Sequence, residues 1–391
     1  MKLSHRVQTL HGTGADGWAV FYRARQMRAD GLPVIELTIG EHDIRTTPNI
    51  IAAMAEAAHA GHTGYADIPG IPALRAEVAA RVEARTGVTT QSNNVLITAG
   101  GQAALFAAFH ASCDPGDTAL FIDPYYATYP GTIRAAGARP KAVQTRSSEG
   151  FLPQETALKP QVAGAKVLLI NSPNNPTGAV YPRDTLEMIA QVTRDHDMWL
   201  ISDEVYDTQV WDGVHLSPRA LPDMAERTLV VGSMSKSHAM TGSRLGWIVG
   251  PEAAIAHLSN LAINTNYGVP GYIQDAALFA LHQGPALEQE VAAPFERRRA
   301  LALEALATQS VVSALPPQGA MYMMLDIRAT HLSGEAFALA LLENHHIAVM
   351  PGESFGMSAA GHIRVAMTVA DEPFAQAFAT LLTFAGELAH A

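Results

Sequence analysis

The first two thirds of the chain alternate short apolar runs with longer, alanine-rich stretches of helical periodicity. Six of the runs are almost continuously apolar, which is typical of parallel strands whose sheet carries helices on both faces. These runs are Val95–Thr98, Ala119–Ile122, Val167–Asn171, Trp199–Asp203, Thr228–Ser233 and Leu245–Val249. The clearest predicted helices are Gly101–Cys113, Pro182–His196 and Pro270–His282. The pattern predicts an α/β fold with a three-layer α/β/α unit around a mostly parallel sheet.

The last third of the chain has a different pattern. A long helical stretch covers about Leu287–Gln309, and a second helix closes the chain. Three alternating apolar segments lie between these helices, at Met321–Ile327, Ile347–Met350 and His362–Ala366. The first forty or so residues have no strand–helix rhythm of their own, so we expect them to join this second unit. The sequence predicts a large domain over residues 46–282 and a smaller α+β domain formed by residues 1–45 and 283–391.

Polar side chains gather where four of the apolar runs end. In chain order, the residues at or just after these ends are Gly100, Gly101, Asn171, Asn174, Asn175, Asp203, Glu204, Tyr206, Ser233, Ser235 and Lys236. In an open α/β sheet the ligand lies beyond the carboxyl ends of the strands. We therefore expect these residues to share one site.

The residue types at this predicted site suit a cofactor that carries an aldehyde, a phosphate and a pyridine ring. A lysine such as Lys236 forms a Schiff base with an aldehyde once its pKa falls, through desolvation or a nearby cation such as Arg244. The segment TAGGQAAL offers free backbone N–H groups at a helix start, which is a seat for phosphate. Asp203 ends a buried strand and needs a cationic partner, which a protonated pyridine nitrogen would supply. Together these groups indicate pyridoxal 5′-phosphate.

Composition narrows the class of protein further. The chain has 391 residues, 48% of them hydrophobic, which is enough for two coupled domains. Its net charge of -11 argues against nucleic acid or an anionic membrane as the main partner. The single cysteine, Cys113, excludes an internal disulfide and a cysteine-rich metal site, and it fits a reducing compartment. With no apolar leader and no membrane-length apolar run, we expect a cytoplasmic protein that binds no metal.

The motifs NSPNNPTGAVY, SDEVY and SKSHAMTGSRLG stand in a fixed order and spacing along the chain. In this respect the chain resembles fold-type I, class I/II pyridoxal-phosphate aminotransferases, and within them the bacterial aspartate-aminotransferase-like subgroup. The resemblance extends from VIELTIGEHD to HIRVAMTVADE, which is nearly the whole chain. It implies a homodimeric enzyme that moves an amino group between an L-amino acid and a 2-oxo acid by a ping-pong mechanism.

The resemblance also implies a role for each matching residue in cofactor binding. Lys236 would form the Schiff base and then shuttle a proton, and Asp203 would pair with the pyridine nitrogen. Asn175 and Tyr206 would hydrogen-bond the phenolic oxygen, while Tyr126 would stack on the ring. The residues implied to hold the phosphate are Gly101, Gln102, Ser233, Arg244 and, from the partner subunit, Tyr65.

For the substrate, the resemblance implies that Arg364 clamps the α-carboxylate, assisted by Asn175 and the backbone of Gly40. The subgroup's acid-specific members carry a basic residue near the position of His110, which makes this histidine the candidate for a side-chain carboxylate. The family's GEPD segment reads GEHD here, followed by Ile44 and Arg45. A neutral imidazole is a weak partner for a carboxylate, so we predict that neutral or aromatic donors are used at least as well as aspartate.

Several alternatives remain open at this stage. The string GTGADG at residues 12–17 matches a dinucleotide-binding motif, but no apolar strand precedes it. The string GESFG at residues 352–356 matches a nucleophile elbow around Ser354, but no clear helix follows it. A sensor domain of a transcription regulator would carry a basic DNA-binding head, which this chain lacks. A pyridoxal-phosphate C–S β-lyase would use the same residues and is the main alternative.

Overall fold

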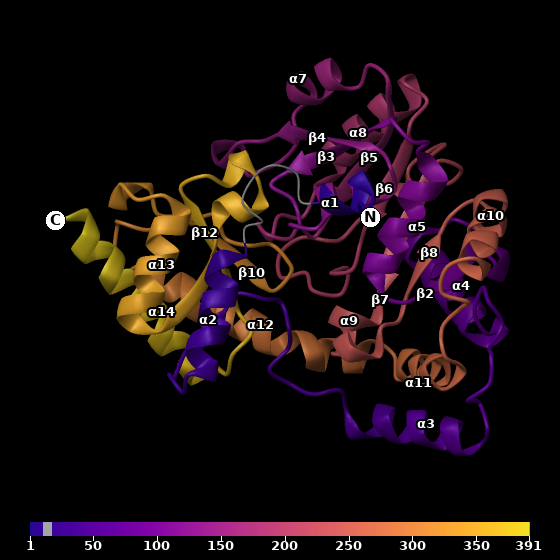
Figure 1. The fold of residues 1–391 in the computed structure, drawn as a ribbon, viewed down its shortest axis with the longest axis horizontal. Helices are drawn as coiled ribbons and strands as arrows, with labels where there is room; N and C mark the ends of the chain where they lie inside the picture. The colour runs from indigo at the N-terminus through magenta and orange to yellow at the C-terminus, as the bar shows by residue number, and fades with distance from the viewer. Residues whose placement is uncertain (11–17, 391) are drawn as a thin grey trace.

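The structure is a computed structural model and describes residues 1–10 and 18–390. The GTGADG string at residues 12–17 lies outside the described residues. Two sheets form the framework, one of seven strands and one of five. Each sheet carries its own helices, so the chain folds into a larger and a smaller lobe, and the smaller lobe contains the C-terminus (Figure 1).

The seven-stranded sheet contains all six strands predicted in the first two thirds of the chain. In spatial order its strands are β2 (Val95–Thr98), β8 (Gly246–Val249), β7 (Thr228–Ser233), β6 (Trp199–Asp203), β5 (Ala165–Asn171), β3 (Thr118–Asp123) and β4 (Arg139–Gln144). Strand β8 runs antiparallel to both neighbours, and the other pairs are parallel. The sequence does not predict β4, because RPKAVQ is an edge strand with alternating exposed positions.

Strand β5 shows why this part of the chain forms three layers. Its successive side chains point to opposite faces of the sheet, and both sets are apolar. Val167 and Leu169 join the cluster of α5 (Gly101–Ser112), whereas Leu168 and Ile170 join that of α8 (Arg183–Asp195). The face of α5 also carries α6 (Tyr129–Ala135) and α10 (Glu252–Ile263), and the face of α8 carries α4 (Pro72–Thr86) and α11 (Gly271–His282). The predicted three-layer α/β fold is confirmed.

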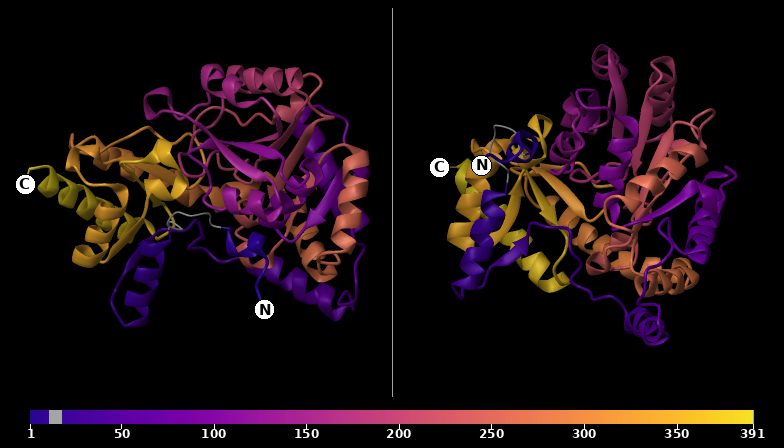
Figure 2. Two further views of the ribbon diagram at one scale, coloured as in Figure 1. Left: turned by 45° about the horizontal axis from the view of Figure 1, so that its top comes forward. Right: turned by 45° about the vertical axis from the view of Figure 1, so that its right-hand side comes forward.

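The five-stranded sheet is built from the two ends of the chain. Its strands, in spatial order, are β1 (Ile35–Leu37), β11 (Ile347–Pro351), β12 (His362–Ala366), β10 (Tyr322–Asp326) and β9 (Ser313–Ala314). Strands β1 and β11 are parallel, and the other pairs are antiparallel. Its helices are α2 (Ala19–Ala29), α13 (Gly334–His345) and α14 (Asp371–Ala389), which lie around this sheet (Figure 2). Their apolar faces complete one core with the strands.

Helix α12 (Pro285–Leu306) connects the two lobes. Leu287 and Val291, in its first half, belong to the core beneath the larger sheet, whereas Phe295 and Ala302 belong to the core of the smaller one. The first residues also contact both lobes, because α1 (His5–Gln8) lies against α6 while β1 joins the smaller sheet. The domain boundaries at residues 46 and 282 stay a prediction.

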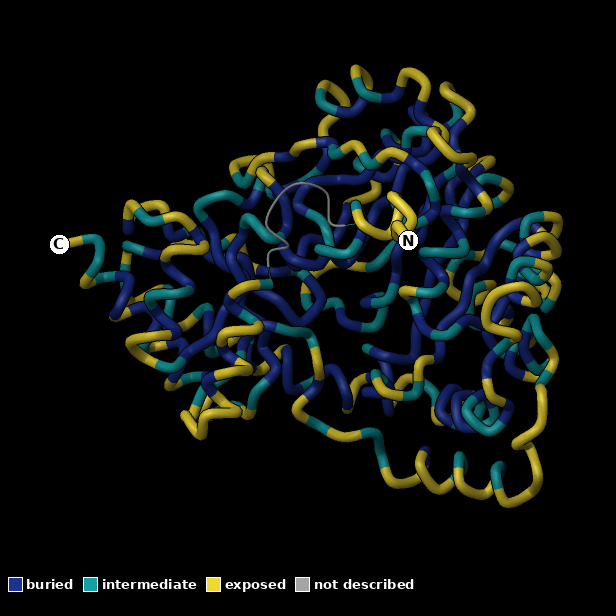
Figure 3. The backbone as a smooth tube through the Cα atoms, in the orientation of Figure 1, coloured by how far each residue is buried: buried dark blue, intermediate teal, exposed yellow. Residues whose placement is uncertain are grey.

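The remaining helices are short or peripheral; they are α3 (Pro48–His59), α7 (Glu155–Leu158) and α9 (Met234–Ser237). Helix α3 packs on α11 and is otherwise largely exposed, whereas the central strands of both sheets are buried (Figure 3). Within the described residues, no helix is long and apolar enough to span a membrane. Nor do residues 1–10 and 18–390 contain a group of three or more acidic, histidine or cysteine side chains that could hold a metal ion.

Candidate active site

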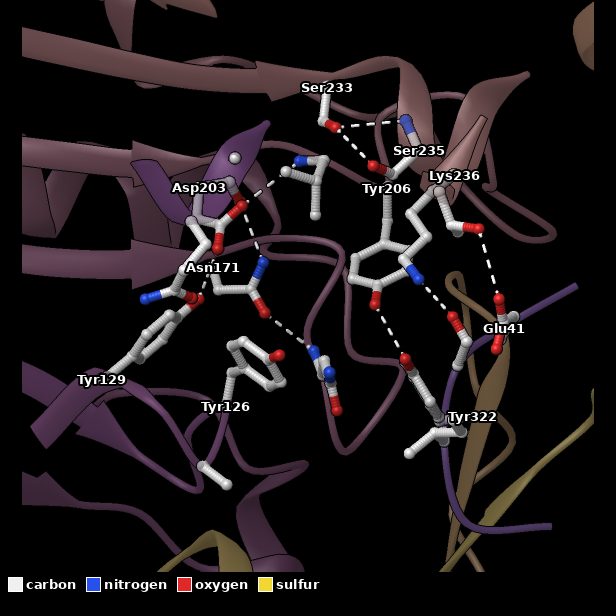
Figure 4. A pocket seen from close by; sticks show the side chains of 18 of the residues that line it. Glu41, Tyr126, Tyr129, Asn171, Asp203, Tyr206, Ser233, Ser235, Lys236 and Tyr322 are labelled. Atoms are coloured by element: carbon white, nitrogen blue, oxygen red, sulfur yellow. Dashed lines mark hydrogen bonds between the residues drawn. The ribbon is translucent and has the colours of Figure 1, made fainter. Parts of the chain in front are cut away.

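One cavity collects the polar strand ends of the larger sheet and faces the smaller sheet. It lies where β5, β6 and β7 end, beside the first turn of α5, and residues of β10 and β12 close its other side. The predicted site residues that line it are Gly40, Gly101, Gln102, Tyr126, Asn175, Asp203, Tyr206, Ser233, Lys236, Arg244 and Arg364. Figure 4 shows Asp203 on one side of this cavity and Lys236, Tyr206 and Tyr322 on the other.

Lys236 is presented to the cavity by the short helix α9. Ser233 caps this helix, since its hydroxyl accepts a hydrogen bond of 3.1 Å from the backbone N–H of Ser235. The Lys236 amine donates a hydrogen bond to the carbonyl oxygen of Gly40. Burial lowers the pKa of Lys236 to about 8, and the positive charges of Arg364 and Arg244 also lower it, whereas Glu41 raises it. A substantial fraction of the amine is therefore neutral and nucleophilic at mildly alkaline pH.

Asp203 is a buried carboxylate, 4% exposed, at the end of β6. The Tyr129 hydroxyl donates to its Oδ2 at 2.6 Å, and the backbone N–H of Val205 donates to Oδ1 at 3.3 Å. Burial raises the pKa of Asp203 to about 6, although both donors lower it. Among the described residues no lysine or arginine forms an ion pair with this carboxylate. A buried anion of this kind, open to a cavity, fits a protonated ring nitrogen.

Two asparagines connect the NNPTG loop to the strand ends. Asn171 accepts a hydrogen bond of 2.7 Å from the backbone N–H of Asn175 and donates one of 2.9 Å to the carbonyl oxygen of Asp203. The first bond holds the backbone of Asn175 at the cavity wall, and its side-chain oxygen accepts a hydrogen bond of 2.8 Å from Arg364. Tyr206 shares a hydrogen bond of 2.8 Å with Tyr322 of β10, so its hydroxyl also has a defined position.

The first turn of α5 and Arg244 form a positive corner of the cavity. The helix N-terminus carries free N–H groups and the positive end of the helix dipole. Gly100 precedes it with a φ of +82°, and a Cβ atom there would lie 2.5 Å from Nη2 of Arg244. The left-handed backbone, together with the close approach of the arginine, thus favours glycine at this position. A corner of this composition suits a phosphate group.

Arg364, on β12, is a buried cation with one edge left open. Its guanidinium lies between the rings of Tyr322 and Phe355, with centroids 4.4 and 4.3 Å away. It donates to Oδ1 of Asn175 at 2.8 Å and to the carbonyl oxygen of Thr38. Its Nε has no hydrogen-bond partner among the described residues. A buried donor without a partner fits a carboxylate ligand.

Two predicted site residues lie away from the cavity of this chain. Tyr65 is 89% exposed and packs edge-on against Tyr267, with ring centroids 5.0 Å apart. His110 follows Gly101 by nine residues on α5, which places it about 13 Å further along the helix. Its Nδ1 lies 2.9 Å from the carbonyl oxygen of Phe106. The structure therefore does not bring His110 to the substrate side of the cavity.

Three of the cavity residues that the sequence does not predict are aromatic and contact predicted site residues; they are Tyr129, Tyr322 and Phe355. Tyr129 is the first residue of α6 and lies three residues after Tyr126 in the segment DPYYATY, which continues strand β3. Tyr322 and Phe355 belong to the smaller lobe and reach the cavity through tertiary packing. No local pattern in the sequence marks them.

These features, a lysine, a buried aspartate and a phosphate corner in one cavity, define a pyridoxal-phosphate site of the kind found in aminotransferases. The chain belongs to the aminotransferase class I and II family, whose model matches residues 33–381. Members of this family depend on pyridoxal phosphate, and the named relatives are transaminases. The protein is a pyridoxal-phosphate-dependent aminotransferase.

Individual relatives cover nearly the whole chain. It is 42% identical to the arginine–pyruvate transaminase of Pseudomonas aeruginosa, with 99% of each chain covered. It is 35% identical to the aspartate/prephenate aminotransferase of Thermus thermophilus over 95% of each chain. A solved structure of a Thermus thermophilus aspartate aminotransferase double mutant matches it with a TM-score of 0.91 at 34% identity, over 99% of each chain.

Proposed function

We propose that the predicted residues hold the cofactor in the cavity between the two sheets. The observation that carries this proposal is that two buried groups line the same cavity. One is the Lys236 amine, whose pKa is lowered, and the other is the Asp203 carboxylate, which has no basic partner among the described residues. Lys236 would bind the aldehyde carbon, Asp203 the ring nitrogen, and Asn175 and Tyr206 the phenolic oxygen. The phosphate would lie against the residues of the positive corner, Gly101, Gln102, Ser233 and Arg244.

When bound, pyridoxal phosphate supplies an electron sink for the negative charge that develops at the substrate's Cα atom. The protein's own contribution is to position groups and to move one proton. Asp203 would keep the ring nitrogen protonated, because its carboxylate would accept a hydrogen bond from the ring N–H group. Lys236 would act as the base that removes the proton from the substrate's Cα atom and would carry that proton during the transfer of the amino group.

On the substrate side, we propose that Arg364 binds the α-carboxylate. The Tyr322 and Phe355 rings both pack against its guanidinium, and its Nε has no hydrogen-bond partner among the described residues, so a donor is left for an anion. Its bonds to Asn175 and Thr38 fix the orientation of the guanidinium. A planar fork held in this way binds a carboxylate through two parallel hydrogen bonds.

We propose that the preferred donors lack a second carboxylate. The cationic side chains among the described cavity residues are Lys236, Arg244 and Arg364, and each has a role already. His110 lies elsewhere on α5. The 42% identical relative is named for arginine and pyruvate, which supports this choice, whereas the aspartate/prephenate enzyme is less similar at 35%.

Half-reactions followed by the absorbance of the bound cofactor test the proposal. L-arginine, L-alanine, L-phenylalanine and L-aspartate are mixed in turn with the holoenzyme, and kcat/KM is obtained for each. We expect at least one of the first three to exceed L-aspartate. A strong preference for L-aspartate would contradict the donor class and point to a cation from Arg45 or from a partner subunit. Absence of any amino-group transfer would contradict the proposed residue roles.

We further propose that the enzyme is a cytoplasmic homodimer in which Tyr65 reaches the phosphate corner of the partner subunit. Tyr65 and Tyr267 form an exposed aromatic pair, 89% and 51% exposed, which is typical of a surface that a partner covers. Light scattering of the purified protein should give twice the mass of the chain. Tyr65→Phe should weaken cofactor retention through the lost hydroxyl while leaving the dimer intact.

A further inference from the structure

The segment GESFG, residues 352–356, contributes an aromatic ring to the active site. It follows β11 and forms the turn η7 (Gly352–Phe355), after which comes a second turn, η8 (Met357–Ala359). Phe355 is 1% exposed, lines the cavity and lies over Arg364. The position of this ring therefore sets one face of the proposed carboxylate site.

The loop that carries Phe355 is fixed to the larger sheet by Asp123, the last residue of β3. The backbone N–H of Met357 donates to Asp123 Oδ2 at 3.0 Å, and that of Ser358 donates to Oδ1 at 3.2 Å. Beside them, the N–H of Tyr125 donates to the carbonyl oxygen of Phe355 at 2.9 Å. The backbone of Phe355 and the two residues Met357 and Ser358 thus take their position from the end of β3 and the segment that follows it.

The fit between Asp123 and the loop is close. Gly356, between Phe355 and Met357, has a φ of +113°, and a Cβ atom there would lie 2.1 Å from Asp123 Oδ1. Asp123 is itself 2% exposed. A buried carboxylate that accepts two backbone N–H groups across an interface is a strong and directional contact.

We infer that Asp123 is a positioning residue, which holds Phe355 against Arg364 and so sets the affinity of the active site for the substrate carboxylate. This inference rests on the proposed role of Arg364. Asp123 joins the lobe that holds the cofactor to the lobe that holds the carboxylate. Its segment, DPYY, ends at Tyr126, which lines the cavity on the side proposed to hold the cofactor.

The charge on Asp123 gives the inference a pH dependence. Burial raises the pKa of Asp123 to about 6, while the N–H groups of Ser358 and Met357 and the Ser358 hydroxyl lower it. The titratable side chain that faces it is Tyr125, and among the described residues no basic side chain pairs with it. Above pH 6 the carboxylate accepts both N–H groups; below pH 6 protonation removes one acceptor. Carboxylate affinity should therefore fall as the pH falls through about 6.

The test uses the holoenzyme and propionate, an unreactive monocarboxylate, with binding followed by the absorbance of the cofactor. We expect Asp123→Asn to raise the Kd for propionate about tenfold at pH 7.5, as one acceptor becomes a donor. Cofactor content should be unchanged. Glu353→Gln is the matched control, because Glu353 accepts two backbone N–H groups in the same loop, from Gly334 and Gly361 of the smaller lobe. It should change the Kd less than about twofold.

Phe355→Leu and the double variant show whether Asp123 acts through the ring. Phe355→Leu should also raise the Kd for propionate about tenfold. In the double variant the Kd should rise by much less than about a hundredfold, the product of the two single effects, because the effects of coupled residues are not additive. The ratio of the Kd of Asp123→Asn to that of wild type should become smaller below pH 6, because Asp123 is then protonated in wild type. The ionisation of propionate affects both proteins equally, so it does not change this ratio. If Asp123→Asn does not fold, Ser358→Ala takes its place, with an expected rise of about threefold.

The outcomes separate the inference from the proposal beneath it. If wild type does not bind propionate, or if Arg364→Ala binds it equally well, the role of Arg364 fails and this inference fails with it. If wild type binds propionate through Arg364 but Asp123→Asn resembles Glu353→Gln, the proposed function stands and the positioning role of Asp123 is wrong. Full additivity of Asp123→Asn and Phe355→Leu would also contradict it.

Discussion

The two walls of the active-site cavity are built in different ways. On the wall of the larger sheet, Asp203, Asn171 and Lys236 follow the ends of adjacent parallel strands, β6, β5 and β7. On the wall of the smaller sheet, Arg364 depends on Thr38 and Phe355, which come from distant parts of the chain. The residues of the first wall are brought together by the ends of adjacent strands, whereas those of the second wall are brought together only by the tertiary fold.

This difference has a functional meaning. The cofactor is common to all members of the family, and the wall proposed to hold it needs only the fixed geometry of a parallel sheet. The donor amino acid varies between relatives, which are named for arginine, aspartate and prephenate. Because the wall of the smaller sheet is assembled from separate segments, one of its residues can be substituted without disturbing the residues that face the cofactor. Substitutions on the two walls should therefore have different kinetic signatures.

The largest effect should follow from Lys236→Met, which removes the amine and keeps the length of the side chain. We expect the rate of amino-group transfer to fall more than about a thousandfold, because nucleophile and proton carrier are lost together. Single-turnover absorbance of the reconstituted variant measures this, with thermal unfolding as a control for the fold. A rate within tenfold of wild type would remove Lys236 from catalysis.

Asp203→Asn should have the next largest effect, a loss of several hundredfold in kcat with little change in KM. A neutral amide does not keep the ring nitrogen protonated, so charge at Cα is poorly stabilised. Steady-state kinetics with a saturating donor give the two constants separately. Equal kcat values for the variant and wild type would show that the carboxylate does not serve the cofactor.

Arg364→Lys tests the second wall and should reduce kcat/KM about a hundredfold, mainly through KM. Lysine keeps the positive charge but loses the planar fork and its packing between Tyr322 and Phe355. The cofactor spectrum should remain that of wild type. A loss carried by kcat with an unchanged KM would contradict the assignment of this wall to the substrate.

A smaller effect, about tenfold in kcat, is expected for Tyr129→Phe, which removes the hydrogen bond to Asp203. That donor lowers the pKa of Asp203, so its loss raises the pKa above about 6. The carboxylate then loses its charge at a higher pH, and the deficit in rate should grow as the pH falls from 8 towards 6. A deficit independent of pH would indicate that Tyr129 acts only on packing.

The smallest effect concerns His110→Ala. Because His110 lies near the far end of α5, we expect the ratio of kcat/KM for L-aspartate to that for L-alanine to change less than twofold, about the size of a neutral surface substitution. The measurement compares both donors between pH 6 and pH 8. A collapse of aspartate activity in this variant would place the imidazole at the substrate after all, through the partner subunit.

The difference between the two walls also explains which site residues the sequence could predict. Asp203 ends one buried apolar run and Lys236 lies three residues after another, so the pattern of apolar runs alone predicts that they lie at the same edge of the sheet. Strand β4 was missed because an edge strand lacks a continuous apolar run. Phe355 stood in a motif suggestive of a nucleophile, and its position depends on Asp123, more than two hundred residues earlier. The distance of His110 from Gly101 follows from helical rise alone.

The most direct test of the central claim, that the larger sheet's wall binds the cofactor through Lys236, is borohydride reduction of the holoenzyme followed by peptide mass mapping. Reduction makes a lysine–cofactor bond permanent, so the modified peptide identifies the lysine. The other lysines, Lys2, Lys141, Lys159 and Lys166, are exposed and offer an internal comparison. We expect one equivalent of cofactor on the peptide that contains Lys236. Cofactor on one of the exposed lysines, or on no peptide, would contradict the account.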